Sequence, residues 1–211
     1  MYWEEFFTIA VAHLFAVASP GPDFAVVMRQ TVTVGREAGL LTSFGVGLGI
    51  LLHIGYCVLG VALLLTQSPA LFSTMKWVAA SYLFVLGVRS CREALSRQAV
   101  IRPAAAETSL RPLRAIGLGF LTNGLNPKAT LFFLALFTLV ISPQTPTTIQ
   151  FLYGIYLAAA TFVWFAVLTL VLGRPLVRRF LLRAGHWFEG GMGLILIALA
   201  LQLAWAEIAR D

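Results

Sequence analysis

The chain has 211 residues, of which 59% are hydrophobic and only 11% are charged. Soluble globular domains average about 45–50% apolar and about 25% charged residues, so this composition excludes an ordinary soluble domain. The net charge of +6 does not indicate a nucleic acid partner, because membrane proteins concentrate Lys and Arg in their cytoplasmic loops. The two cysteines, Cys57 and Cys91, are far apart and form neither a metal-binding nor a redox motif.

Six apolar runs follow one another along the chain, and the hydrocarbon core of a bilayer, roughly 30 Å thick, needs about 20 apolar residues per helix. Lipid offers the backbone no hydrogen-bond partners, so each run is predicted to be a helix. The third run is extended back to Leu71, because its apolar centre alone is too short. The predicted spans are Glu5–Met28, Gly39–Leu65, Trp77–Val88 with that extension, Ala115–Ile141, Ile149–Leu172 and Trp187–Trp205. The expected fold class is an all-α integral membrane protein.

The basic residues predict how the spans are oriented. Of the 15 Lys and Arg residues, 12 fall in the loops that follow the first, third and fifth spans. The positive-inside rule makes these three loops cytoplasmic, which leaves both termini outside, in the periplasm. Trp3, Trp77, Trp187 and Trp205 lie at span ends, where aromatic anchors meet the bilayer surface. We therefore expect a multi-pass protein of the bacterial inner membrane, embedded in the lipid bilayer.

Two of the spans are interrupted about halfway by proline and glycine. The interrupting segments are Ser19-Pro20-Gly21-Pro22-Asp23 in the first span and Asn123-Gly124-Leu125-Asn126-Pro127-Lys128 in the fourth. Each half of the chain contains three spans, so the second half enters the membrane from the side opposite to the first. The six helices are therefore predicted to form two inverted three-helix repeats, each with a broken first helix. Repeat one covers about 1–92, a cytoplasmic linker about 93–113 and repeat two about 114–211, within a single transmembrane domain of 1–211.

Each interruption contains residues suited to starting a new helix. In the first span, Pro20 or Pro22 suits the first helical position, with Ser19 or Gly21 as the preceding cap. Asp23 then lies in the first turn, where the helix dipole stabilises a carboxylate.

In the fourth span, Asn126 is the expected cap and Pro127 the first helical residue. Lys128 then lies where the helix dipole opposes a positive charge. A charge within a bilayer costs about 2.5–3.5 kcal/mol on insertion scales. Asp23 and Lys128 are therefore expected either to neutralise one another or to face water and a bound molecule.

His53, near the middle of the second span, is a further candidate. Its titration could couple to a flow of protons, or its ring could bond to a neighbouring helix, and the sequence leaves both open. His13 lies nearer the predicted outer face. The glycines that precede His53, at positions 45, 47 and 49, predict close packing against another helix.

Four stretches of the sequence together resemble the LysE/RhtB family of amino-acid exporters. They are SPGPDFAVV in the first span, the glycine-rich second span, MKWVAASYLFVLGVRSCREAL in the third and FLTNGLNPKATLFF in the fourth. The resemblance covers nearly the whole chain and is strongest to the homoserine/threonine efflux branch. It implies a six-span, dimeric exporter driven by the proton motive force. The family's motif positions fall on Pro20, Gly21, Pro22 and Asp23, and on Asn123, Asn126, Pro127 and Lys128.

The residues and the resemblance together predict a secondary active exporter of a small amino acid that exchanges its substrate for protons. A neutral, threonine- or homoserine-like amino acid is favoured, because Asp23 is the only clear carboxylate within a span. The expected pathway for substrate and protons comprises Ser19, Pro20, Gly21, Pro22, Asp23, His53, Asn123, Asn126, Pro127 and Lys128. No cofactor, catalytic residue or metal site is indicated.

Several alternatives remain open. Carbonyl groups at half-helix ends also bind cations, so export of cationic amino acids or of a metal cation is one, although His13, His53 and Asp23 make an unconvincing set of metal ligands. A membrane-embedded enzyme would need a catalytic set, and a thiol oxidoreductase would need cysteines at both interruptions, where this chain has none. A scaffold protein would have no use for broken helices with charges inside the membrane.

Overall fold

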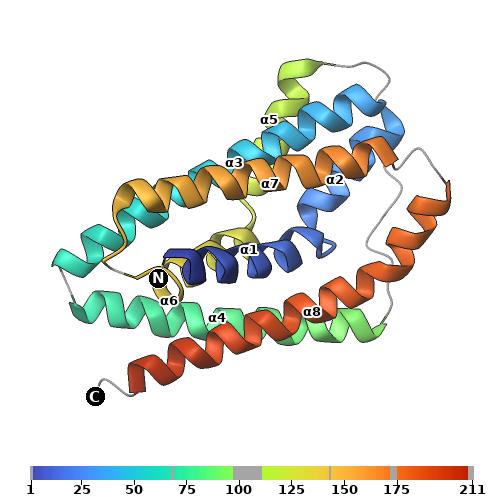
Figure 1. Ribbon diagram of the computed structural model, residues 1–211. Coiled ribbons are helices and arrows are strands. Elements are labelled where there is room, and N and C mark those ends of the chain that lie inside the picture. Colours follow the sequence, from blue (N-terminus) through green and yellow to red (C-terminus); the bar gives the residue numbers. More distant parts are fainter. Residues whose placement is uncertain (1, 68, 97–110, 143, 172–174, 209–211) are drawn as a thin grey trace.

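The computed structural model describes residues 2–67, 69–96, 111–142, 144–171 and 175–208. Every regular element within these ranges is an α-helix, as the sequence predicted (Figure 1). The helices are α1 (Tyr2–Ala18), α2 (Pro22–Thr33), α3 (Arg36–Gln67), α4 (Pro69–Ser96), α5 (Pro112–Gly124), α6 (Pro127–Leu139), α7 (Thr147–Val171) and α8 (Pro175–Ile208). Most of the predicted linker, and the predicted end of the fifth span at residue 172, lie outside the described residues.

Proline marks the start of many of these helices. The first residue of α2, α4, α5, α6 and α8 is a proline, whose missing N–H and fixed φ suit the first position of a helix. The turn from α2 to α3 instead depends on Gly35, whose φ of 132° is one that other residues rarely adopt. Local chemistry thus sets the boundaries of most helices.

The order of the helices repeats once along the chain. A pair of short helices, α1–α2 or α5–α6, is followed by two long ones, α3–α4 or α7–α8. The long helices lie side by side across the halves, α3 with α7 and α4 with α8 (Figure 1). The start of α1 and the end of α8 lie at one end of the molecule, while the starts of α3, α5 and α8 lie at the other (Figure 1).

Two of the described helices are by themselves long and apolar enough to cross a membrane, at Arg36–Gly60 and Thr147–Val171. The pair α1–α2 adds a third span if it is counted as one helix bent by 53°. The helices α5 and α6 have 13 residues each, or about 20 Å at 1.5 Å per residue, so neither alone would cross the hydrocarbon. The six spans and the inverted relation of the halves therefore stay predictions.

The glycines of α3 lie where other helices approach its backbone most closely. A Cβ atom at Gly45 would overlap the carbonyl oxygen of Ile116 on α5, and a Cβ at Gly119 would overlap that of Thr42 on α3. A Cβ at Gly47 would lie 3.0 Å from the carbonyl oxygen of Ala158 on α7. The predicted role of the glycine run in helix packing is confirmed, and it serves two neighbouring helices.

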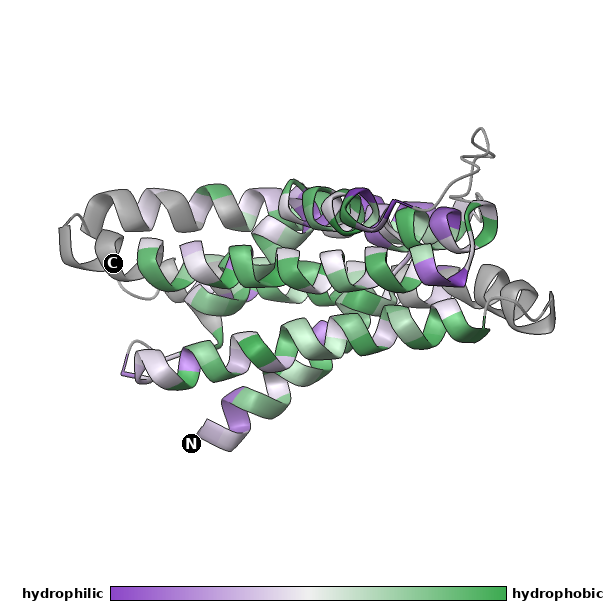
Figure 2. Cartoon of the chain, turned by 90° about the horizontal axis from the view of Figure 1, so that it is seen from above, coloured by the Kyte–Doolittle hydropathy of each residue, from purple (hydrophilic) through white to green (hydrophobic). Residues whose placement is uncertain are grey.

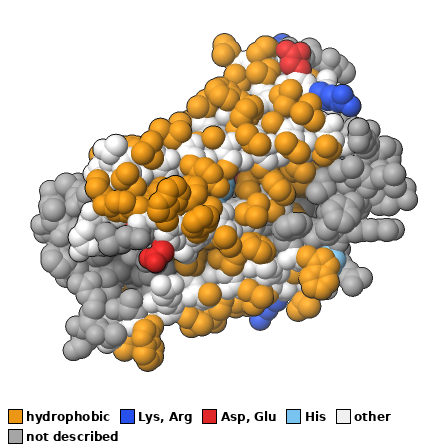
Figure 3. All heavy atoms as spheres, in the orientation of Figure 1, with side chains coloured by type: hydrophobic (Ala, Val, Ile, Leu, Met, Phe, Trp, Pro, Cys, Tyr) orange, Lys and Arg blue, Asp and Glu red, His pale blue; other side chains and the backbone are white. Residues whose placement is uncertain are grey.

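The outer surface of the helices is apolar over much of its extent. Hydrophobic residues run along the length of the described helices (Figure 2), and hydrophobic side chains cover most of the described surface on one face (Figure 3). Large side chains such as Leu59 and Val163 are exposed. A surface of this kind suits contact with lipid tails, which need no hydrogen bonds.

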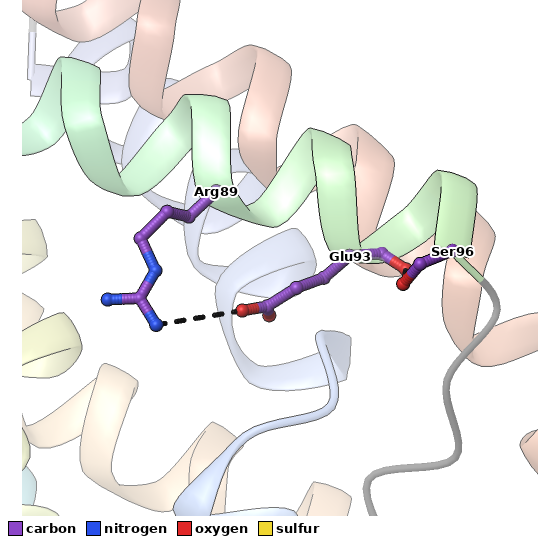
Figure 4. Close-up of polar contacts among 3 residues, drawn as sticks. All are labelled: Arg89, Glu93 and Ser96. Atoms are coloured by element: carbon purple, nitrogen blue, oxygen red, sulfur yellow. Dashed lines mark hydrogen bonds and ion pairs between the residues drawn. The ribbon is translucent and has the colours of Figure 1, made fainter.

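The end of α4 carries polar contacts at the surface. At the end of α4, one guanidinium nitrogen of Arg89 lies 3.9 Å from a carboxylate oxygen of Glu93, and Ser96 donates a hydrogen bond to the Glu93 carbonyl (Figure 4). Both charged side chains are well exposed, so such a pair contributes at most about 0.5 kcal/mol.

The start of α1 is tied to the connection between α6 and α7 by one carboxylate. Glu5 accepts hydrogen bonds from the Ser142 N–H, the Thr145 hydroxyl and the Tyr153 hydroxyl at 2.9–3.3 Å. This contact fixes the first turn of α1 at the end of the molecule where the chain begins.

Candidate functional site

The two interruptions begin new helices much as the sequence predicted. In α2 the cap is Gly21 and the first residue is Pro22, with Asp23 in the first turn. The alternative start at Pro20 is not used, because the Ser19 N–H still donates to the Phe15 carbonyl and so continues α1. Glycine has no side chain with which to cap the N–H groups of this first turn, and α2 therefore begins with an open amino end.

In α6 the cap is Asn126 and the first residue is Pro127, as predicted. The side-chain oxygen of Asn126 accepts a hydrogen bond of 3.0 Å from the Lys128 N–H. The amino end of α6 is therefore closed by a side chain, unlike that of α2.

The polar residues of the two interruptions bind one another across the halves of the chain. One carboxylate oxygen of Asp23 accepts hydrogen bonds from the side-chain amides of Asn123, at 2.9 Å, and Asn126, at 3.3 Å. In return the Lys128 ammonium donates to the Ser19 hydroxyl at 2.8 Å, and its positive charge interacts favourably with Asp23. Asp23 and Lys128 thus lie close enough to lower one another's cost of burial.

These residues line a partly open pocket between the two breaks. The space between the lining side chains measures about 510 Å³, a volume that includes solvent at its open mouth. The second carboxylate oxygen of Asp23 is buried and has no hydrogen-bond partner among the described residues. A buried acceptor of this kind is costly unless something binds it.

Seven of the ten predicted pathway residues line this pocket, namely Ser19, Gly21, Pro22, Asp23, Asn123, Asn126 and Lys128. Pro20 and Pro127 belong to the breaks themselves and are not among the lining residues. The structure therefore gathers the two motifs into one place, while the role of each residue in transport stays a prediction.

His53 lies behind the pocket wall. Its Nε2 bonds to the backbone carbonyl of Asn123 at 3.0 Å, and its Nδ1 bonds to the Tyr56 hydroxyl at 2.5 Å. Its ring is fully buried and stacks on Phe133 with 5.4 Å between ring centroids. The sequence left two interpretations of His53 open. The geometry agrees with the second, a histidine bonded to a neighbouring helix, because the His53 ring bonds to the end of α5.

Two polar residues of the pocket were not among the predicted pathway residues. His13 and Thr161 both line the pocket and bond to one another, with 2.9 Å between His13 Nε2 and the Thr161 hydroxyl oxygen. The sequence placed His13 nearer the outer face, and Thr161 is a lone threonine in an apolar run. Neither residue carried a sequence signal that connects it with the two interruptions.

The described residues were also searched for groups that could hold a metal ion. Across these ranges, no three His, Cys, Asp or Glu side chains come together in such an arrangement.

Comparison with known proteins finds related sequences that match nearly the whole chain. The family model for the LysE type translocator matches residues 14–207. The threonine efflux protein of Escherichia coli is 30% identical over 200 residues, which cover 94% of this chain and 96% of that protein. The leucine efflux protein of Klebsiella pneumoniae is 28% identical over 205 residues, or 94% of each chain. No solved structure matches the chain significantly.

The family match and the shared length leave no large part of the chain unaccounted for. Members of this family are translocators, so the chain is a membrane transporter and not an enzyme. The described elements are all helices, as expected from the resemblance. By the match of its sequence, this chain belongs to the family of LysE type translocators.

Proposed function

We propose that this translocator exports a small neutral amino acid, of the threonine or homoserine kind, across the bacterial inner membrane in exchange for protons. The observation that carries the proposal is the buried Asp23 carboxylate, one oxygen of which has no hydrogen-bond partner among the described residues and which shares the pocket with Lys128 and the start of α2, where Gly21 provides no side-chain cap. The names of the relatives, threonine efflux and leucine efflux proteins, support an amino-acid substrate.

The polar groups of the pocket match the two charges that every amino acid carries. The open oxygen of Asp23 accepts from the substrate ammonium, a bond that is strong because both partners are charged. The uncapped N–H groups at the start of α2, with the Lys128 ammonium nearby, bind the substrate carboxylate. A neutral substrate leaves the net charge of the pocket unchanged.

Proton exchange follows from the same carboxylate. When the substrate leaves, a proton from outside takes the place of its ammonium on Asp23, and the two halves return with Asp23 neutral. With one proton exchanged per neutral amino acid, a membrane potential of about 100 mV supplies roughly 2.3 kcal/mol, enough for an outward gradient of about fiftyfold. The chain works as a homodimer with both termini in the periplasm, as the resemblance and the basic loops imply.

The test is transport by the purified protein in lipid vesicles with a pH gradient, using a panel of labelled amino acids. We expect protein-dependent movement of threonine or homoserine that an uncoupler stops and that Asp23→Asn reduces to less than about 1%. Glu93→Gln is the matched control, because it makes the same change to an exposed carboxylate on α4. If Asp23→Asn transports at the wild-type rate, Asp23 does not carry the substrate or the proton. If only arginine, lysine or a metal ion moves, the neutral substrate class is wrong.

A further inference from the structure

The pocket is lined by a polar and charged group of side chains, called here the charged end, and by a larger group of apolar ones. The charged end holds Ser19, Asp23, Asn123, Asn126 and Lys128, and the apolar side chains include Ile50, Phe132, Phe133, Phe165 and Met192. Two lining residues fit neither description, His13 on α1 and Thr161 on α7. They are polar side chains placed among aromatic and aliphatic ones, and the proposed function so far gives them no role.

This pair shares the pocket with the charged groups. Both residues are almost completely buried, with 4% of His13 and 2% of Thr161 exposed. They line the same pocket as Asp23 and Lys128. An amino acid held by its charged groups beside Asp23 therefore occupies the pocket that His13 and Thr161 also line.

We propose that the His13–Thr161 pair binds the side-chain hydroxyl of the substrate and selects hydroxylated amino acids over aliphatic ones of the same shape. This inference rests on the proposed function and assigns the specificity of the same site. If the His13 ring donates, the Thr161 hydroxyl keeps its own O–H and one lone pair for the substrate; if Thr161 donates, its oxygen keeps two lone pairs and can accept from the substrate. A hydroxyl, which also donates and accepts, completes this arrangement.

The size of the selectivity follows from the bond within the pair. Because His13 and Thr161 already satisfy one another at 2.9 Å, an aliphatic side chain next to them leaves neither group wholly without a partner. The preference for a hydroxylated over an aliphatic substrate therefore corresponds to about one net hydrogen bond, which is roughly three- to tenfold. A site whose only partner is the substrate hydroxyl would discriminate by about 10⁴-fold or more.

The experiment compares three substrates that differ at one atom or one centre. L-Threonine and L-valine have nearly the same shape, and L-allo-threonine places the hydroxyl in the other configuration. Vesicles containing the full-length protein are assayed with each, as wild type, Thr161→Val and Thr161→Ser. Thr169→Val is the matched control, because Thr169 is a fully buried threonine on the same helix that bonds across to Thr31 and does not line the pocket.

We expect wild type to move threonine about three- to tenfold faster than valine and faster than allo-threonine. Thr161→Val should bring the threonine-to-valine ratio close to one while total transport persists, and Thr161→Ser should keep the preference. Thr169→Val should leave the ratio at its wild-type value.

Three results distinguish the failure of this inference from the failure of the proposed function. If wild type transports amino acids but Thr161→Val leaves the threonine-to-valine ratio unchanged, the pair does not read the hydroxyl and only this inference is overturned. A wild-type preference for valine or leucine over threonine overturns it as well. If folded wild-type protein transports no amino acid, the proposed function and this inference fail together.

Discussion

The helix α5, the first part of the second broken pair, packs closely along α3, whereas its counterpart α1 touches α7 and α8 at few places. Glycines let the α5 and α3 backbones approach, at Gly45 and Gly119. Side-chain contacts hold α1 instead: Ile9 is fully buried in the apolar core, Glu5 is bound at the start of the helix, and His13 bonds to Thr161 farther along.

The same contrast extends to the helices that follow each break. The Asn126 side chain closes the start of α6, while the start of α2 after Gly21 is open. The second break is therefore the more closely packed side of the pocket and contributes Lys128, whereas the first break contributes the second oxygen of Asp23 and a helix start without a side-chain cap. Three sets of substitutions test this difference between the two breaks.

The largest effect is expected where the second break is packed most closely. Gly119→Val would push a side chain into the carbonyl oxygen of Thr42, and overpacking of this kind costs about 2–4 kcal/mol of stability. Gly117→Val is the matched control on the same helix, because no described atom lies within 4 Å of a Cβ placed there. We expect a clearly lower unfolding temperature in detergent for Gly119→Val alone. Equal unfolding temperatures for both variants would show that the two helices do not depend on this contact.

The next effect concerns the charges that join the two breaks. Asp23→Asn or Lys128→Met alone leaves one buried charge without its opposite, and each is expected to cost about 2–4 kcal/mol. The double variant should recover at least 1 kcal/mol of the summed loss, as coupled residues do, while transport stays below about 1% in all three. Unfolding measurements and vesicle assays together check this prediction. Strictly additive losses of stability would mean that the two charges do not act on one another.

The smallest effect tests the open and closed helix ends. Gly21→Ser has room, because a Cβ there meets only the Ser19 carbonyl oxygen at 3.9 Å, and a serine cap adds a few tenths of a kcal/mol over glycine. Its hydroxyl would occupy an N–H group that the substrate carboxylate needs, so we expect the KM to rise about three- to tenfold. Asn126→Ala should instead lower stability by about 1 kcal/mol. An unchanged KM for Gly21→Ser would show that the open end of α2 does not bind substrate.

The sequence predicted those features that depend on neighbouring residues. The cap at Asn126, the helix start at Pro127 and the close packing at the glycines follow from local chemistry, and the structure has them all. The choice of Pro22 over Pro20 did not follow, because both prolines suit a helix start and only the continued hydrogen bonding of α1 excludes one.

The features that the sequence missed depend on distant residues. Thr161 lies 148 positions from His13, and a threonine in an apolar run carries no sign of its partner. The two amide donors to Asp23 come from positions 100 and 103 residues later, so the motifs alone left open whether the charge is paired or exposed. The number of spans stays a prediction, because half of a broken span is too short to be recognised by its length.

The cross-bonding of the two breaks has a consequence for biosynthesis. The hydrogen-bond donors to Asp23 lie at positions 123 and 126, so a ribosome working at about 5–20 residues per second makes them roughly 5–20 s after Asp23 itself. During this interval the first broken helix holds a carboxylate in or near the bilayer without its amide donors. The insertion machinery must therefore retain the early half, or let it reach water, until the later half emerges to complete it.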